Sequence, residues 1–293
     1  MFKLSERPKI HILHIGEFSF FMPWEQWYSK VEEVCRCKIQ YAVKEQIENK
    51  SADIPASKVK ENLLQNKNLI KIFEGYDLVR FDRNWSQEVF NLVIVAPPLI
   101  TVLQSIDLIY KKKGSFWPQL NFKDGVHSAI LQNKPYLNTN GAGLIVGSST
   151  DAIQVAYVLA ELGIKQITFV VESDNIRSPL LELMKNSLFQ INFEVITKEK
   201  IILLPGIYSV MICCEDLKHN SDLLTALLYF NYLERGGLIL NPVYTLDKVP
   251  LMEEALAIGA TCVDLPQIQL HEEVVALQKL GLLAIDRLFQ IKP

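Results

Sequence analysis

The sequence predicts an α/β protein of two domains, an amino-terminal α/β domain and a doubly wound parallel-sheet domain of the Rossmann type. Three observations support this. The 293 residues correspond to about two domains at roughly 150 residues each. Apolar residues make up 49% of the chain and charged residues 22%, as in ordinary globular proteins. From Gly141 onward, strand-like runs alternate with helix-length segments, the pattern of parallel strands joined by crossover helices.

The amino-terminal part contains two candidate strands and two candidate helices. Lys9–Ile15 alternates and is rich in isoleucine, which predicts a strand, and the segment after Pro23 has a helical pattern. Residues 44–71 are polar and rich in lysine, which predicts a solvated helix with its flanks. Asn91–Ala96 is a continuous apolar run followed by two prolines, as expected for a strand buried on both faces.

Residues 110–125 keep no periodicity, so we expect the first domain boundary between this stretch and Gly141. They include the basic run Lys111–Lys113, which we interpret as the rim of a loop, with a phosphate contact as the alternative. We place the first domain boundary after this stretch. The expected domains are residues 1–140, completed by a carboxy-terminal helical region at 269–293, and residues 141–268.

The second domain follows a strand, helix, strand, helix, strand order, which predicts a βαβαβ unit with right-handed crossovers. A further strand, helix and strand follow, and a last helical region could pack back on the first domain. The expected elements are a strand at 141–147, a helix at 151–163, a strand at 165–172, a second helix, and strands at 191–197 and 208–214, then a helix at 221–237, a strand at 236–242 and helix at 269–289.

The turn after the first strand of this unit reads GSSTDA and keeps one glycine of a G-x-G-x-x-A phosphate-binding turn, Gly147. Ser148, Ser149 and Thr150 can donate hydrogen bonds to a phosphate group, whereas Asp151 places negative charge near it. Two interpretations stay open. The turn is either a modified dinucleotide site or the amino-terminal cap of a helix that binds no nucleotide.

Glu172 ends the second strand of the unit. An acidic residue in this place accepts hydrogen bonds from a ribose diol and repels a 2′-phosphate. If a dinucleotide binds, the sequence therefore favours NAD over NADP.

Charge and hydropathy exclude several kinds of partner. The 30 basic residues nearly cancel the 33 acidic ones, so no net field attracts nucleic acid or an anionic membrane, and we expect a small-molecule ligand. No run of about 18 apolar residues predicts a membrane span, and the first ten residues lack the apolar core of a signal peptide. We therefore expect a cytoplasmic protein with reduced cysteines and no metal site, and leave homodimerisation open.

Two stretches resemble the shikimate dehydrogenase family. Gly143–Val171 is similar to the family's cofactor domain, in which a strand, a glycine-rich turn, a helix ending in LAELG and a second strand follow in this order. Asn241–Ala255 is similar, without a gap, to D-x-x-Y-N-P-x-x-T-P-L-L-x-x-A and retains Tyr244, Pro250 and Leu251. The resemblance implies an NAD(P)-dependent oxidoreductase that acts on a small hydroxylated acid.

The resemblance also implies site residues. The family's catalytic Asp, from an N-T-D-G motif, falls on Asp124 of Lys123-Asp124-Gly125, although Asp-Gly is also a common turn pair. Its lysine partner falls on Leu99, so Lys123 or a residue of the 111–113 run would have to replace it. Tyr244 would line the substrate pocket, and Glu272 takes the place of a glutamine near the substrate.

Two functions follow from these matches and losses. The first is a divergent dehydrogenase in which Asp124 and Lys123 transfer the proton. The second is a catalytically inactive paralogue that keeps the fold as a small-molecule-binding or interaction module. The second is motivated by the missing lysine and glycines, and by residues 20–23, which replace a Ser-x-Ser-Pro with Phe-Phe-Met-Pro.

Overall fold

The structure is a computed structural model of the chain. It describes residues 8–16, 20, 22–44, 73–82, 85–90, 96–134, 137–172, 179–188, 190–217, 220–243, 250–282 and 285–290. The chain divides into two compact units, Met1–Asn121 together with Glu273–Pro293, and Phe122–Glu272. The domain limits expected from the sequence differ from this division in the placement of residues 122–140 and 269–272, and we keep them as a proposal.

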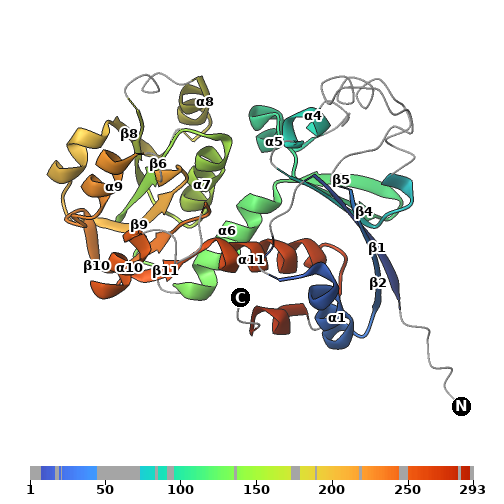
Figure 1. The fold of residues 1–293 in the computed structure, drawn as a ribbon. Coiled ribbons are helices and arrows are strands. Elements are labelled where there is room, and N and C mark those ends of the chain that lie inside the picture. Colours follow the sequence, from blue (N-terminus) through green and yellow to red (C-terminus); the bar gives the residue numbers. More distant parts are fainter. Residues whose placement is uncertain are drawn as a thin grey trace, which may run out of the picture. The chain divides into compact units, whose positions relative to one another are not determined.

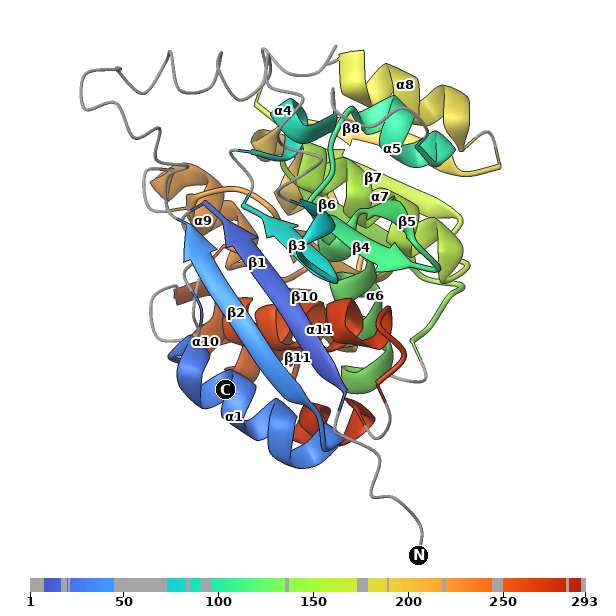
Figure 2. The same cartoon turned by 90° about the vertical axis from the view of Figure 1, so that its right-hand side faces the viewer.

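The first unit contains a five-stranded mixed sheet in the order β2-β1-β3-β4-β5, which Figure 2 shows strand by strand. Its strands are β1 (Lys9–Ile15), β2 (Lys38–Lys44), β3 (Leu78–Phe81), β4 (Leu108–Lys112) and β5 (Ser115–Gln119). β1 pairs in parallel with β2 and β3, whereas β4 is antiparallel to both of its neighbours. The predicted first strand is therefore confirmed, and it lies inside the sheet.

Four helices are described wholly within the first unit: α1 (Trp24–Cys35), α4 (Ser86–Phe90), α5 (Pro98–Leu103) and the 3-10 helix η5 (Ile285–Gln290). The predicted helix after Pro23 is confirmed as α1. It ends at Cys35, and the next residue, Arg36, has a left-handed φ of 53°, as is common at helix carboxyl ends. Most of the expected strand at 91–96 and the polar segment at 45–71 lie outside the described residues.

Residues 110–125 lack periodicity in the sequence but form regular structure, and of the run interpreted as a loop rim Lys111 and Lys112 belong to a strand. This stretch contains most of β4, all of β5 and the start of α6 (Asn121–Asn133). The two strands form a hairpin through Lys113 and Gly114, which both have positive φ, 51° and 80°. β5 lies at the edge of the sheet and is partly exposed, so its sequence can hold Pro118 and shows no apolar alternation.

The second unit contains a six-stranded parallel sheet in the order β11-β10-β9-β6-β7-β8 (Figure 1). The chain runs outward from β6 in one direction and from β9 in the other, so the topological switch point lies between β6 and β9. The strands are β6 (Ala142–Val146), β7 (Gln166–Val170), β8 (Asn192–Ile196), β9 (Tyr208–Cys213), β10 (Leu233–Leu240) and β11 (Thr261–Val263).

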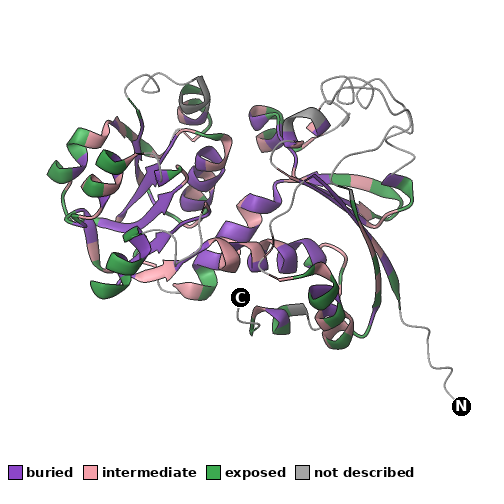
Figure 3. Cartoon of the chain, in the orientation of Figure 1, coloured by how far each residue is buried: buried purple, intermediate pink, exposed green. Residues whose placement is uncertain are grey.

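The βαβαβ unit predicted from the sequence is confirmed. α7 (Thr150–Glu161) connects β6 to β7, and α8 (Pro179–Ser187) connects β7 to β8. The 3-10 helix η2 (Lys198–Leu203), α9 (Ser221–Leu227) and α10 (Pro250–Ala257) complete the connections. β6 and β9 are buried along their whole length, as Figure 3 shows, whereas the edge strand β8 is partly exposed. Burial on both faces explains their continuous apolar runs.

Two expected helices have different limits. The helix predicted at 221–237 ends at Leu227, because Phe230 adopts a left-handed φ of 48° and β10 starts at Leu233. β10 carries a register shift around Gly236, so its first half lacks a strand pattern. The helical region predicted at 269–289 is divided into α11 (Leu265–Gln278) and η5, with a turn at Gly281.

Candidate functional site

The glycine turn of the second unit leads from the buried strand β6 to the amino end of α7. Gly147 has a φ of 112°, a conformation that favours glycine, and its N–H donates a hydrogen bond to the carbonyl of Val170 over 2.8 Å. Ser149 caps the helix, and its Oγ accepts a hydrogen bond from the Ala152 N–H over 3.3 Å. The turn therefore has the geometry in which a bound anion would lie at the amino end of the helix.

The carboxylate of Glu215 lies on this turn. The Cys214 N–H donates to the Val146 carbonyl over 2.9 Å, which places the next residue beside the start of the turn. A Cβ on Gly147 would meet Glu215 Oε1 at 2.9 Å and Cγ at 3.0 Å. The backbone N–H of Ser148 donates a hydrogen bond to the same carboxylate. The chain thus supplies an anion to its own turn.

The surroundings of Glu215 are acidic. The side chain is partly buried, and burial raises the pKa of its carboxyl group above the ordinary value of 4.5. The charges of Glu172 and Asp216 raise this pKa further, whereas the hydrogen bond from the Ser148 N–H lowers it. Three carboxylates, those of Glu172, Glu215 and Asp216, therefore influence one another near this turn.

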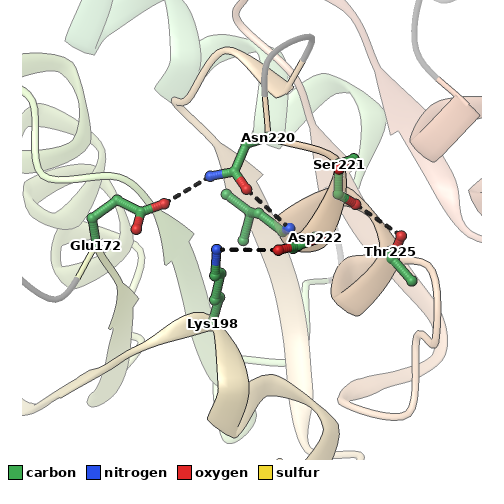
Figure 4. A network of polar contacts seen from close by, with 7 residues as sticks. Glu172, Lys198, Asn220, Ser221, Asp222 and Thr225 are labelled. Atoms are coloured by element: carbon green, nitrogen blue, oxygen red, sulfur yellow. Dashed lines mark hydrogen bonds and ion pairs between the residues drawn. The ribbon is translucent and has the colours of Figure 1, made fainter.

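Glu172, the residue expected to bind a ribose, has an intramolecular partner. It is exposed just after β7, and its Oε1 accepts a hydrogen bond from Asn220 Nδ2 over 2.7 Å (Figure 4). Asn220 in turn caps α9, because its Oδ1 accepts from the Leu223 N–H over 3.1 Å. The nearby Lys198 is also engaged, with its Nζ 3.8 Å from Asp222 Oδ2.

These residues do not fit a dinucleotide phosphate in the arrangement that the structure shows. A pyrophosphate would approach Gly147 where the Glu215 carboxylate lies. Two unit charges 4 Å apart repel each other by about 4 kcal/mol at an effective dielectric constant of about 20. In this arrangement the turn supports no reaction step through NAD or NADP.

Lys123 and Asp124 lie on α6, next to the far end of α7. The Lys123 ammonium binds Glu161 Oε2 over 2.7 Å and lies 3.9 Å from Asp124 Oδ1. Glu161 is the last residue of α7, whereas the glycine turn precedes its first residue, and a helix of this length spans about 18 Å. The structure brings Lys123 and Asp124 together, but it does not bring the Lys123 ammonium to the turn.

Gly125 and Glu272 mark a close approach of α6 and α11. A Cβ on Gly125 would meet the Glu272 Cγ at 2.5 Å and its Cα and backbone N at 3.0 Å. The Asp124-Gly125 pair lies within α6 and not in a turn. Because Gly125 has no side chain, α6 and α11 can touch at this point. One turn further along, Ser128 Oγ lies 2.9 Å from Nδ1 of His271. Burial lowers the pKa of His271 to about 4.

Two other positions belong to the expected site, Tyr244 and Leu99. Tyr244 lies outside the described residues, so its expected place in a substrate pocket stays a prediction. Leu99, at the position of the family's lysine, lies in the first turn of α5 and is half-buried. A leucine side chain transfers no proton.

The first unit contains a polar cluster that the sequence did not predict. His14 lies near the end of β1 and is fully buried. Its Nε2 is 2.6 Å from the Tyr28 hydroxyl oxygen, and its ring centroid is 4.2 Å from that of Trp24. Burial, and then the charge of Arg80, lower the pKa of His14 well below 6.5. Arg80 forms a buried ion pair with Glu273 of α11. The only sequence signal was the alternation of β1, which left His14 as an ordinary strand residue.

Metal and disulfide chemistry find no support in the described part of the chain. No group of three His, Cys, Asp or Glu side chains gathers there as a metal site requires. None of the five cysteines, all of which lie in the described part of the chain, forms a disulfide, and burial raises the pKa of the Cys213 thiol to about 12. No described helix combines the length and apolar character of a membrane span.

Comparison with known proteins establishes the fold. No family model and no curated protein sequence matches the chain. Quinate dehydrogenase from Corynebacterium glutamicum, in complex with NAD, matches with a TM-score of 0.72, 13% identity and coverage of 97% of this chain and 98% of the other. Shikimate 5-dehydrogenase from Listeria monocytogenes, in complex with shikimate and NAD, matches with a TM-score of 0.69 and 12% identity. The match covers 96% of this chain and 95% of the other.

A third match, shikimate 5-dehydrogenase from Thermus thermophilus in complex with shikimate, has a TM-score of 0.68, 12% identity and coverage of 96% of this chain and 100% of the other. The protein therefore has a two-domain α/β fold with a Rossmann-like parallel sheet. It is the fold of the shikimate and quinate dehydrogenases, as the two resembling stretches indicated. At 12–13% sequence identity, these matches show a common fold and nothing beyond it.

Proposed function

We propose that the protein is a catalytically inactive relative of the shikimate dehydrogenases that binds a small hydroxylated acid and transfers no hydride. The observation that carries this proposal is the Glu215 carboxylate on Gly147. Dehydrogenation needs a nicotinamide cofactor to accept the hydride. A turn that holds a carboxylate of its own offers the pyrophosphate of such a cofactor no free position.

The proton-transfer residues support the same conclusion. Oxidation of a secondary alcohol needs a proton acceptor that acts together with hydride transfer. Leu99 stands at the position of the family's lysine, and Lys123 is bound by Glu161. Loss of one partner of a catalytic pair commonly lowers the rate by orders of magnitude.

The ligand class rests on the fold. Two of the matching structures are complexes with shikimate, and both units of this chain are covered by those matches. We therefore expect a polyhydroxylated carboxylic acid rather than an apolar ligand.

The second candidate is an NAD-dependent dehydrogenase, and one observation favours it. The Lys123 ammonium lies 3.9 Å from Asp124 Oδ1, so a lysine and the expected acid/base residue are neighbours. This pair would act only if the Lys123 ammonium left the Glu161 carboxylate and contacted the substrate instead.

Two measurements on the full chain separate these functions. Calorimetric titration with shikimate and quinate tests ligand binding, and absorbance of reduced nicotinamide tests turnover with NAD or NADP. We expect binding of at least one acid and no reduction of either dinucleotide. Reduction of NAD that Asp124→Asn abolishes would establish the dehydrogenase instead.

A further inference from the structure

The carboxyl end of a parallel sheet at its topological switch point is where ligands bind in open α/β folds. In this chain the switch point lies between β6 and β9, and the loops after these strands carry Gly147 and Glu215. The Cys214 N–H donates to the Val146 carbonyl, so the backbone places Glu215 next to the glycine, and its side-chain oxygen reaches the position that a Cβ on Gly147 would take. The sheet register therefore brings the two residues together.

The cradle beneath the carboxylate is still that of an anion site. Gly147 keeps its positive φ, the Ser148 N–H donates to an anionic oxygen, and α7 starts directly afterwards with its amino end capped by Ser149. The anion that these groups bind is intramolecular. A tethered group competes at a high effective concentration, so a free anion has to displace it.

Displacement alone would not make room for a pyrophosphate. The displaced carboxylate stays close to the turn, since its backbone is held by β9. Burial, and then the charges of Glu172 and Asp216, raise the pKa of Glu215, and Lys198 is engaged with Asp222. A phosphate group would enter a region of like charge.

We propose that Glu215 is the specificity-determining residue of this turn: its carboxylate occupies the anion subsite, excludes dinucleotides and offers an acceptor to a neutral or cationic donor, a hydroxyl or an ammonium group. This inference rests on the proposed function and deepens it. It also implies that one side chain separates the turn from an anion-binding one.

The test compares the full-length protein with Glu215→Gln and Glu215→Ala by calorimetric titration with NAD and with inorganic pyrophosphate. Glu215→Gln keeps the size and removes the charge, and Glu215→Ala removes both. Glu194→Gln is the matched control, because it makes the same change at an exposed position of the edge strand β8. We expect both Glu215 variants to bind each probe at least about tenfold more tightly than wild type and the control to be unchanged.

A third variant, Glu215→Asp, keeps the charge on a shorter side chain and should bind no more tightly than wild type. Circular dichroism checks that each variant is folded. The wild-type protein provides a test without substitution, because protonation of Glu215 removes its charge. Its affinity for pyrophosphate should rise as the pH falls toward the raised pKa of this carboxyl group.

The outcomes separate this inference from the proposed function. If wild type binds NAD but Glu215→Gln binds it at least tenfold more tightly, the inference holds and the proposed function loses its main support. If neither wild type nor any Glu215 variant binds either probe at any pH tested, the inference is overturned while the proposed function stands. Equal binding by wild type and Glu215→Gln overturns both.

Discussion

Arg80 on β3 and Glu273 on α11 form an ion pair in which both side chains are buried, with exposed fractions of 7% and 1%. The pair connects a strand from the first third of the chain to a helix near its end. It lies beside His14, which pairs with Arg80 in the register of β1 and β3. A charged pair at this depth is a strong constraint on what can replace either residue.

We expect Glu273→Gln to destabilise the protein by about 3–5 kcal/mol, because it leaves the Arg80 charge buried without its carboxylate. Urea unfolding followed by circular dichroism measures the change. The control is the double variant Arg80→Met/Glu273→Leu, which removes both charges and should recover most of the stability. A double variant as unstable as Glu273→Gln would contradict this account.

Stability should decrease as the pH falls below about 6.5, in part because of His271. Burial lowers the pKa of His271 to about 4 in the folded protein, whereas the unfolded chain has the ordinary value of 6.5. Between these values the unfolded state binds a proton that the folded state does not, so acid favours unfolding. The shift corresponds to about 3 kcal/mol at most, lost between about pH 6.5 and 4.

The measurement is the free energy of unfolding of wild type and His271→Gln across this pH range. We expect the two curves to converge as the pH falls, since only the wild type gains the His271 proton on unfolding. His14, whose pKa is also lowered, remains in both proteins and causes a shared decrease. Parallel curves would show that His271 does not contribute.

Gly125→Ala should destabilise the protein by about 1–3 kcal/mol, although alanine favours a helix by about 1 kcal/mol over glycine. The new Cβ would meet the side chain and the backbone of Glu272. Thermal unfolding measures the loss. In Gly125→Ala/Glu272→Ala the contact with Cγ disappears and the backbone contacts remain, so we expect partial recovery; none at all would place the strain elsewhere.

Asn220→Ala should cost about 0.5–2 kcal/mol, because Asn220 caps α9 and also donates to Glu172. Asn220→Asp separates the two roles. It retains an oxygen for the Leu223 N–H but places a second negative charge beside Glu172, so we expect an intermediate loss that added salt reduces. If Asn220→Asp were as stable as wild type without salt, the contact with Glu172 would be of no consequence.

The sheet elements could be predicted from the sequence wherever burial leaves a pattern. β6, β7 and β9 are buried runs, and β1 alternates, so local composition identified them. β5 could not be predicted, since an edge strand with exposed residues has no apolar period. The end of α9 depended on the left-handed Phe230, which no residue preference favours.

Some residues of the candidate site could likewise be predicted from the sequence, and others could not. Gly147, Ser149 and Glu172 could be found because they follow predicted strands along the chain. Glu215 also follows a strand, Tyr208–Cys213, but no local pattern shows that it reaches the glycine turn. A search of the residues after each strand of the sheet, instead of the first two strands alone, would have included it.

The sequence by itself determined the two-domain α/β class, the βαβαβ order and the resemblance to shikimate dehydrogenases, because these depend on periodicity and on residues adjacent in the chain. Only the tertiary structure decided which side chains meet. The Glu215 carboxylate reaches Gly147 through the pairing of β6 with β9, and Glu273 reaches Arg80 through the packing of α11. Contacts between residues far apart in the chain arise from strand order and packing, which no local sequence pattern records.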